Sequence, residues 1–123
     1  MINELIGWQI VSMDKQGFVI TKDGEKRTFK FDEDEGDCCG FNNFDAKLVY
    51  EEGSADNPVI TAINFDEDES DYDENHVIIT FFGGHKLLAK IDSLSSSGSG
   101  WCYGACVTCR CVETNEEETI SCW

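Results

Sequence analysis

Two β-hairpin signals constrain the fold of this chain more than any other feature of its sequence. In the first, "KDGE" (22–25) joins "GFVIT" (17–21) to "KRTFKF" (26–31). Its Asp-Gly pair supplies the positive φ angles that a tight turn between two strands requires. In the second, "HVIITFFGG" (76–84) is followed directly by "HKLLAKID" (85–92), which predicts a strand, a tight turn and another strand. Both signals indicate antiparallel pairing of neighbouring segments.

A helix is predicted between the two hairpins. In "NNFDAKLVYEEG" (42–53), Asn43 is a candidate N-cap, Phe44 and Leu48 begin an apolar stripe at helical spacing, and Gly53 can end the helix. A helical turn at 2–6 and strands at 8–13, 59–65 and 101–114 are also predicted, the last strand bent or bulged at Gly104. We therefore expect an α+β fold, with about six to seven strands in a mostly antiparallel, meander-like sheet and one main helix packed on a face.

The length of the chain, 123 residues, is typical of one domain. We expect that domain to span residues 1–123, with a C-terminal tail (114–123) that either docks or stays loose. No run approaches the roughly 20 apolar residues of a membrane span, and "MINELIGWQI" lacks the features of a signal peptide. The sequence therefore predicts a cytoplasmic protein. Its seven cysteines are expected to be reduced thiols, since disulfides are rare in that compartment.

Charge is the most unusual part of the composition. The chain has 25 Asp and Glu residues against 9 Lys and Arg, a net charge of −16. Fifteen of these acids fall in three runs, "DEDEGD" (32–37), "DEDESDYDE" (66–74) and "EEE" (116–118), while four basic residues gather at 22–30. Direct binding to nucleic acid is disfavoured, because phosphates would meet a repulsive field. The runs are expected in turns and at strand ends, where they either protect strand edges or imitate a polyanion.

The sequence gives no support for catalysis, a metal site or a cofactor. A zinc site is conceivable from the cysteines at 102, 106, 109 and 111 with Cys38 and Cys39, but strand alternation turns Cys106 away from Cys109 and Cys111. A calcium loop beginning at Asp66 fails at its sixth and twelfth positions. His76 and His85 lie in no nucleophile motif. We therefore expect a protein that is not an enzyme and whose cysteines fill space.

The segment "SSSGSGWCYGAC" (95–106) is the strongest candidate for a ligand site. Its glycines allow backbone N–H groups to approach a phosphate, and its two aromatic rings can stack on a base. Basic residues elsewhere could compensate the ligand's charge. The simpler alternative is a loop anchored to the core by its aromatic residues. The candidate ligand-binding residues are Ser99, Gly100, Trp101, Tyr103, Gly104, Arg110, Lys86 and Lys90.

A short motif also carries a resemblance to a known family. With Gly36, Asp37, Cys38 and Cys39, and with Tyr103-Gly104 later in the chain, residues 2–112 resemble a largely bacteriophage-encoded family of small acidic proteins with a Gly-Asp-Cys-Cys motif. That family is a domain of unknown function, so no residue roles carry over. The resemblance implies a phage accessory protein aimed at host defences, acting in the cytoplasm of the infected cell.

Three functions are compatible with these observations. In the first, the protein sequesters a small host ligand such as a nucleotide immune signal, and homo-oligomerisation would help by burying the ligand between subunits. In the second, it imitates DNA and binds a host nuclease, a restriction or CRISPR component or a repressor. The third is a structural or regulatory phage domain. The acidic surface of the second consists of Asp32, Glu33, Asp34, Glu35, Asp66, Glu67, Asp68, Glu69, Asp71, Asp73 and Glu74.

Overall fold

The protein is a β-sandwich of two antiparallel sheets. The computed structural model describes residues 1–35, 40–49, 58–68, 74–96 and 105–123. A 3-10 turn, η1 (Ile2–Glu4), precedes the first strand, where a helical turn was expected. The strands are β1 (Gln9–Asp14), β2 (Gly17–Lys22), β3 (Glu25–Asp34), β4 (Phe41–Leu48), β5 (Ala62–Asp68), β6 (Glu74–Gly83), β7 (Lys86–Ser96), β8 (Cys106–Cys111) and β9 (Glu117–Cys122).

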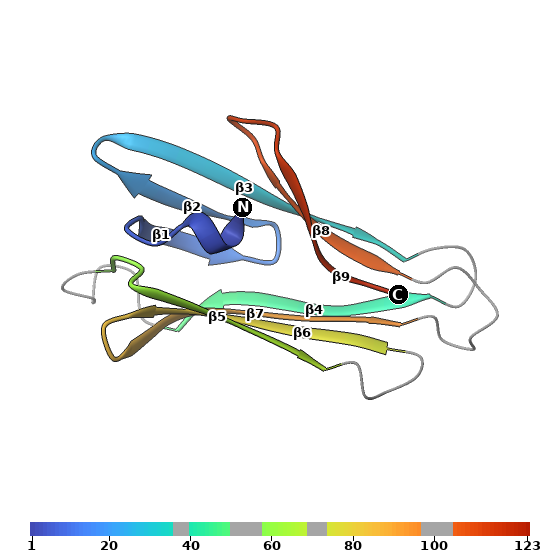
Figure 1. The fold of residues 1–123 in the computed structure, drawn as a ribbon. Coiled ribbons are helices and arrows are strands. Elements are labelled where there is room, and N and C mark those ends of the chain that lie inside the picture. Colours follow the sequence, from blue (N-terminus) through green and yellow to red (C-terminus); the bar gives the residue numbers. More distant parts are fainter. Residues whose placement is uncertain (36–39, 50–57, 69–73, 97–104) are drawn as a thin grey trace.

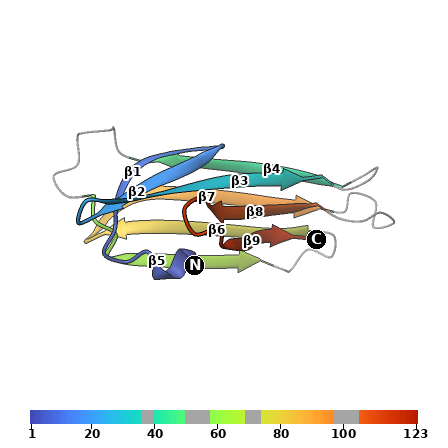
Figure 2. The same cartoon turned by 90° about the horizontal axis from the view of Figure 1, so that it is seen from above.

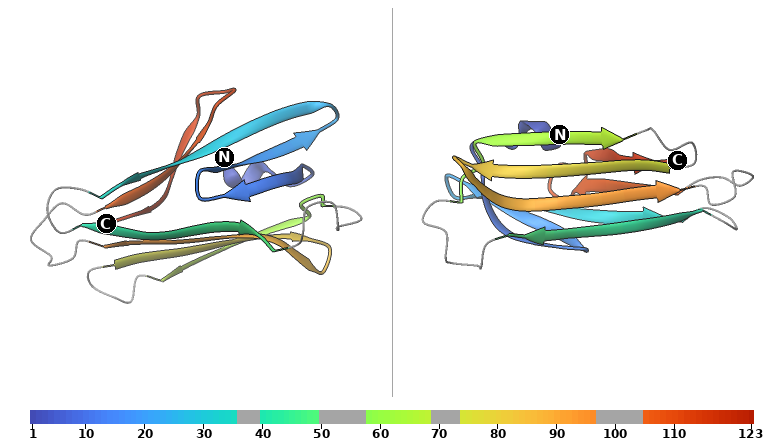
Figure 3. Two further views of the ribbon diagram at one scale, coloured as in Figure 1. Left: turned by 180° about the vertical axis from the view of Figure 1, so that it is seen from behind. Right: turned by 90° about the horizontal axis from the view of Figure 1, so that it is seen from below.

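One sheet combines segments from both ends of the chain, and the other is formed by the middle of the chain. The five-stranded sheet has the order β1-β2-β3-β8-β9, and the four-stranded sheet has the order β4-β7-β6-β5. The sheets form two layers (Figure 1). Seen from above, β1 lies over β4 on one side, and β9 lies over β6 toward the other (Figure 2). The view from behind shows the same two layers (Figure 3).

Both predicted hairpins are confirmed. Asp23 and Gly24 have φ angles of 52° and 82° between β2 and β3, as a tight Asp-Gly turn requires. Gly84 has a φ of 64° between β6 and β7. The β2–β3 pair keeps one register from Gly17–Lys30 to Lys22–Glu25. The antiparallel pairing that the sequence indicated is therefore present in both sheets.

The predicted α+β fold is wrong, because the described part of the chain contains no α-helix. Residues 42–48 of the expected helix at 42–53 belong to β4, which pairs with β7 along its whole length, and residues 50–53 lie outside the described residues. Phe44 and Ala46 are buried, while Asp45 and Lys47 are exposed. A spacing of four between Phe44 and Leu48 is a multiple of two as well as roughly one helical turn. The alternation of buried and exposed side chains is that of a strand, in which every second residue faces the other sheet.

The strands also run further than the sequence indicated. The first acidic run was expected to end a strand at residue 31, but β3 continues through Asp32, Glu33 and Asp34. The second run was expected to be a long turn, but its first three residues belong to β5. The tail at 114–123 contains β9, which pairs with β8. Backbone pairing with a neighbouring strand holds each of these polar segments in the sheets.

One half of the interior is apolar and aromatic. Phe18, Phe29 and Phe31 from the five-stranded sheet meet Phe44 and Phe81 from the four-stranded sheet. Phe18 stacks on Phe29 with 4.5 Å between ring centroids and lies 6.3 Å from Phe81 across the sandwich. Phe31 meets the edge of Phe44 at 4.9 Å. We call this set the apolar half; it joins the two sheets by burial of large rings.

The other half of the interior contains hydroxyl and amide groups. The Ser121 hydroxyl, on β9, lies 2.7 Å from the hydroxyls of both Ser93 and Ser95 on β7, and all three side chains are buried. Ser95 also donates to Asn42 Oδ1 at 2.7 Å. Asn75, another buried residue, accepts the Cys122 backbone N–H at 3.0 Å. We call these five residues (Asn42, Asn75, Ser93, Ser95, Ser121) the polar half; hydrogen bonds take the place of aromatic contacts there.

Candidate binding surface

The two long acidic runs meet at one end of the sandwich. β3 and β5 end there, and β6 begins there, at the right of Figure 1. Asn42 of β4 links the two sheets at this end, because its Nδ2 donates to the carbonyls of Asp34 on β3 at 3.2 Å and of Cys106 on β8 at 3.3 Å. We call the described carboxylates at this end the acidic end: Asp32, Glu33, Asp34, Glu35, Asp66, Glu67, Asp68 and Glu74.

Strand geometry arranges these carboxylates in rows. On β3, Phe29 and Phe31 face the interior, so Asp32 and Asp34 lie on the outer face of the five-stranded sheet. On β5, Asp66 and Asp68 pair with Ile78 and His76, which alternate with buried residues of β6 and therefore lie on the outer face of the other sheet. Residues two apart on a strand are about 6.5–7 Å apart along it. The acidic end thus presents charges at regular spacing on both outer faces.

Basic residues are absent from these rows. On the outer face of the five-stranded sheet, the Asp32–Thr108 pair belongs to the acidic end. The neighbouring outward-facing pair, Lys30 with Arg110, is basic. In the other sheet, Lys90 pairs with Lys47 and Thr80, and the next outward row contains Asp45, Asp92 and Ile78. All nine basic residues lie in described segments outside the acidic end: Lys15, Lys22, Lys26, Arg27, Lys30, Lys47, Lys86, Lys90 and Arg110. The acidic end therefore contains negative charge alone, whereas acidic and basic residues are mixed over the rest of the sandwich.

A hollow in the outer face of the four-stranded sheet forms part of the acidic end. It has a volume of about 390 Å³ and is lined by Asp66, Glu67, Asp68, His76 and Ile78. The His76 ring is held by Asp92, with 2.7 Å between Nε2 and Oδ1. Within the described ranges, no three His, Cys, Asp or Glu side chains are grouped closely enough to hold a metal ion. The hollow is thus a negatively charged surface that suits an organic cation or a basic side chain.

The structure describes three residues of the candidate ligand site, and it does not bring them together. Arg110 lies on the outer face of the five-stranded sheet, because it alternates with buried Cys109 and Cys111. Lys90 lies on the outer face of the opposite sheet, and Lys86 begins β7 at the end of the sandwich away from Ser96. Ser99, Gly100, Trp101, Tyr103 and Gly104 lie outside the described residues, as do Glu69, Asp71 and Asp73 of the acidic set. Capture of a nucleotide by this loop stays a prediction.

The cysteines follow the predicted alternation, but one pair departs from the expected chemistry. Cys109 and Cys111 are buried free thiols, as the sequence predicted for one face of the strand. Burial, assisted by the nearby Glu118 carboxylate, raises the pKa of the Cys109 thiol to about 12, so this thiol stays protonated and unreactive. Cys106, on the outer face, forms a disulfide with Cys122 of β9. The expectation of reduced thiols is therefore corrected for this pair; Cys38, Cys39 and Cys102 lie outside the described residues.

Sequence reasoning missed several residues that organise this end of the molecule. Asn75 donates to Glu67 Oε1 at 2.8 Å, which fixes that carboxylate against the polar half. Glu118 accepts the Ile2 backbone N–H at 2.9 Å and so ties β9 to the N-terminal turn. Neither contact has a local signal, because the partners are 8 and 116 residues apart in the chain. The β-branched pair Thr119-Ile120 is the one local signal that favours a strand at β9.

Comparison with known proteins gives no relative on which a role could be based. No protein-family model, no curated protein and no solved structure matches the chain. In the described segments, no helix is long and apolar enough to cross a membrane. Any function must therefore be argued from the surface itself.

Proposed function

We propose that this protein is a non-catalytic binding protein whose acidic end engages the nucleic-acid-binding face of a basic protein. One observation carries the proposal: carboxylates from two distant runs are held in paired strands at one end of the sandwich, and no basic residue lies among them. Charges fixed by strand pairing need less ordering on binding than charges in a loop, so more of the electrostatic attraction contributes to affinity.

The partner class follows from the form of the surface. Each strand of DNA presents one phosphate about every 3.4 Å along the helix axis, and proteins that bind DNA contact those phosphates with Lys and Arg. Outward carboxylates of β3 and β5 recur at about twice that interval. Such a surface can occupy lysines and arginines that otherwise contact DNA. In the setting implied by the family resemblance, the partner is a nuclease, a restriction or CRISPR component or a repressor in the cytoplasm of the infected cell.

Competition with DNA tests this function. The full-length protein is immobilised and exposed to a panel of purified bacterial repressors and nucleases at 50 mM salt. We expect at least one panel member to be retained, to be released by a 20-base-pair duplex, and to bind at least tenfold more weakly at 200 mM salt. Retention that neither duplex nor salt reduces would contradict the proposal, and so would the absence of any retained protein.

Charge variants locate the surface. The Asp32→Asn/Asp66→Asn variant removes one outward carboxylate from each sheet at the acidic end, and we expect weaker retention and a shallower dependence on salt. The matched control is Glu4→Gln/Glu116→Gln, which removes the same charge from exposed positions outside the acidic end. Equal weakening by both variants would mean that net charge alone, and not this end of the sandwich, governs binding.

A further inference from the structure

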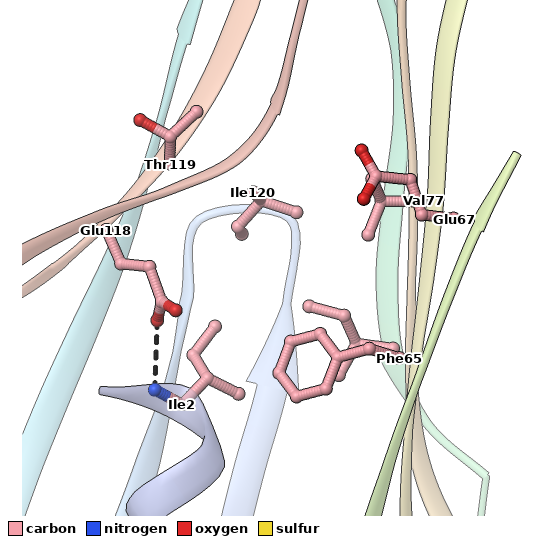
Figure 4. A pocket seen from close by; sticks show the side chains of 8 residues that line it. Ile2, Phe65, Glu67, Val77, Glu118, Thr119 and Ile120 are labelled. Carbon is pink, nitrogen blue, oxygen red and sulfur yellow. Dashed lines mark hydrogen bonds between the residues drawn. The ribbon is translucent and has the colours of Figure 1, made fainter. Parts of the chain in front are cut away.

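A pocket lies between the two sheets on the side where β9 faces β5 and β6. Its volume is about 190 Å³, and Phe65, Val77, Ile79 and Ile120 provide an apolar wall. Two carboxylates, Glu67 and Glu118, border it from opposite sheets (Figure 4). Glu67 also lines the hollow at the acidic end, so the same carboxylate borders both the pocket and the surface of the proposed function. An elongated ligand with an apolar body and a charged head would satisfy both kinds of lining.

Both carboxylates are held in place before any ligand arrives. Glu118 Oε2 accepts the Ile2 backbone N–H at 2.9 Å, the contact drawn as a dashed line in Figure 4. Glu67 Oε1 accepts Asn75 Nδ2 at 2.8 Å, and Asn75 is itself fixed by the Cys122 N–H. These bonds orient the carboxylates and occupy one oxygen of each. The ordering cost of forming a charged contact is thereby reduced.

Charge around the pocket favours a cationic guest. The N-terminal amine of Met1 lies 3.9 Å from Glu118 Oε2 and compensates part of that charge. Glu67 has an amide, a neutral group, as its hydrogen-bond partner among the described residues. Glu67 is exposed and the Glu118 side chain is 32% exposed, so a cation can reach both carboxylates from solvent.

Among protein cations, arginine matches the pocket best. Its methylene stem can lie along Val77, Ile79 and Ile120, and its planar guanidinium can form two parallel hydrogen bonds to one carboxylate. Phe65 is 45% exposed at this pocket, so its ring is available to stack on the guanidinium. Lysine has neither the planar fork nor the weak hydration that stacking requires.

We propose that this pocket binds an arginine side chain of the partner. The assignment rests on the proposed function for the source of the arginine, since a protein that meets DNA phosphates presents arginines on its surface. Arginine binding by the pocket can nevertheless be measured without any partner.

The test uses N-acetyl-arginine-methylamide, a small probe, titrated into the full-length protein while the methyl signals of Val77, Ile79 and Ile120 are followed by NMR. We expect saturable shifts of these signals. The citrulline analogue, which has almost the same shape and no charge, should cause none, and the lysine analogue should bind more weakly than arginine. Equal shifts with citrulline would show an apolar groove without charge selection, and no saturable shift with arginine would overturn the proposal.

Matched variants test whether the Glu67 carboxylate binds the arginine probe. Glu67→Gln keeps the shape and the partner Asn75, and we expect it to weaken binding of the arginine probe about tenfold. Glu117→Gln, on the same strand as Glu118 but exposed and outside the pocket, removes the same charge and should have less than a twofold effect. Equal weakening by the two would assign the effect to net charge and overturn the pocket.

The two proposals fail in different ways. A protein that competes with DNA for a basic partner but does not bind the arginine probe retains the proposed function and loses the arginine pocket. A protein that binds the arginine probe, with loss in Glu67→Gln, but retains no DNA-binding protein keeps the pocket and loses the proposed partner class.

Discussion

The two halves of the sandwich interior join the same two sheets in different ways. In the apolar half, five phenylalanine rings meet across the sheets, and the hydrophobic effect that drives their burial has no direction. In the polar half, Ser121 must lie between Ser93 and Ser95, and Asn42 must reach two carbonyls, so one register is favoured. We therefore expect the apolar half to provide most of the free energy of unfolding, and the polar half to fix the position of the acidic strand ends.

The largest effect should come from the apolar half. Phe81 is fully buried and lies opposite Phe18, so Phe81→Ala removes a ring that the surroundings cannot replace. We expect the free energy of unfolding, measured with urea, to fall by about 3–5 kcal/mol. Phe41→Ala, at a ring that is 43% exposed, is the control and should cost much less. Similar losses in both variants would show that the stability does not depend on the aromatic contacts between sheets.

The disulfide should have the next largest effect. Cys106 and Cys122 are 16 residues apart in sequence, and closing a loop of that length restricts the unfolded chain. Under oxidising conditions, Cys122→Ser should lower the free energy of unfolding by about 3 kcal/mol. Adding a reductant should bring the wild-type protein to nearly the same value. An unchanged stability in both comparisons would mean that the two sulfurs are not bonded in solution.

A smaller loss is expected from the polar half. Ser121→Ala removes the group shared by Ser93 and Ser95 and leaves buried hydroxyls with fewer partners, at a cost of about 1–2 kcal/mol. Replacing all three serines by alanine should cost less than the sum of the single changes, because no hydroxyl then remains unpaired. Urea unfolding of the single and triple variants measures this difference. Strict additivity would argue against a cooperative network.

The smallest effect at neutral pH concerns Cys109, on the same strand as Cys106 of the disulfide. Its thiol is buried, and its pKa is raised from 9.0 to about 12. Above about pH 9 the unfolded chain loses this proton while the folded protein keeps it, so stability falls as pH rises toward 12. The difference in free energy of unfolding between wild type and Cys109→Ala should therefore shrink from pH 7 to pH 10.5. A constant difference would show that the thiol is not desolvated.

Local patterns in the sequence indicated the hairpins but not the partners of distant strands. Asp23-Gly24 and the alternation around Gly84 predicted two turns and four strands, because the deciding contacts are between neighbours in the chain. Phe44 and Leu48 were assigned to a helix because their spacing fits both periods, and the pairing of β4 with β7 decides between them. Charge alone suggested that Asp32–Asp34 and Asp66–Asp68 leave the strands.

For the candidate surface too, the sequence indicated the residues but not which of them lie together. The acidic residues were identified from the sequence. They lie at one end because β3 and β5, which belong to different sheets, both run toward that end (Figure 1). Glu67 and Glu118 line the same pocket, and hydrogen bonds from the Asn75 side chain and the Ile2 backbone N–H position their carboxylates. Contacts of this range have no signature in a single sequence, since nothing local distinguishes these residues from other surface acids.

The excess of negative charge at the acidic end gives the protein an electric dipole moment along the sandwich. In the field of a basic partner, a molecule with this moment experiences a torque that turns its acidic end forward before the surfaces touch. A larger share of diffusional encounters then begins in a productive orientation, and the rate of association rises above that of a molecule with the same net charge spread evenly. Moving two carboxylates from β3 and β5 to the opposite end would leave the charge at −16 and slow that approach.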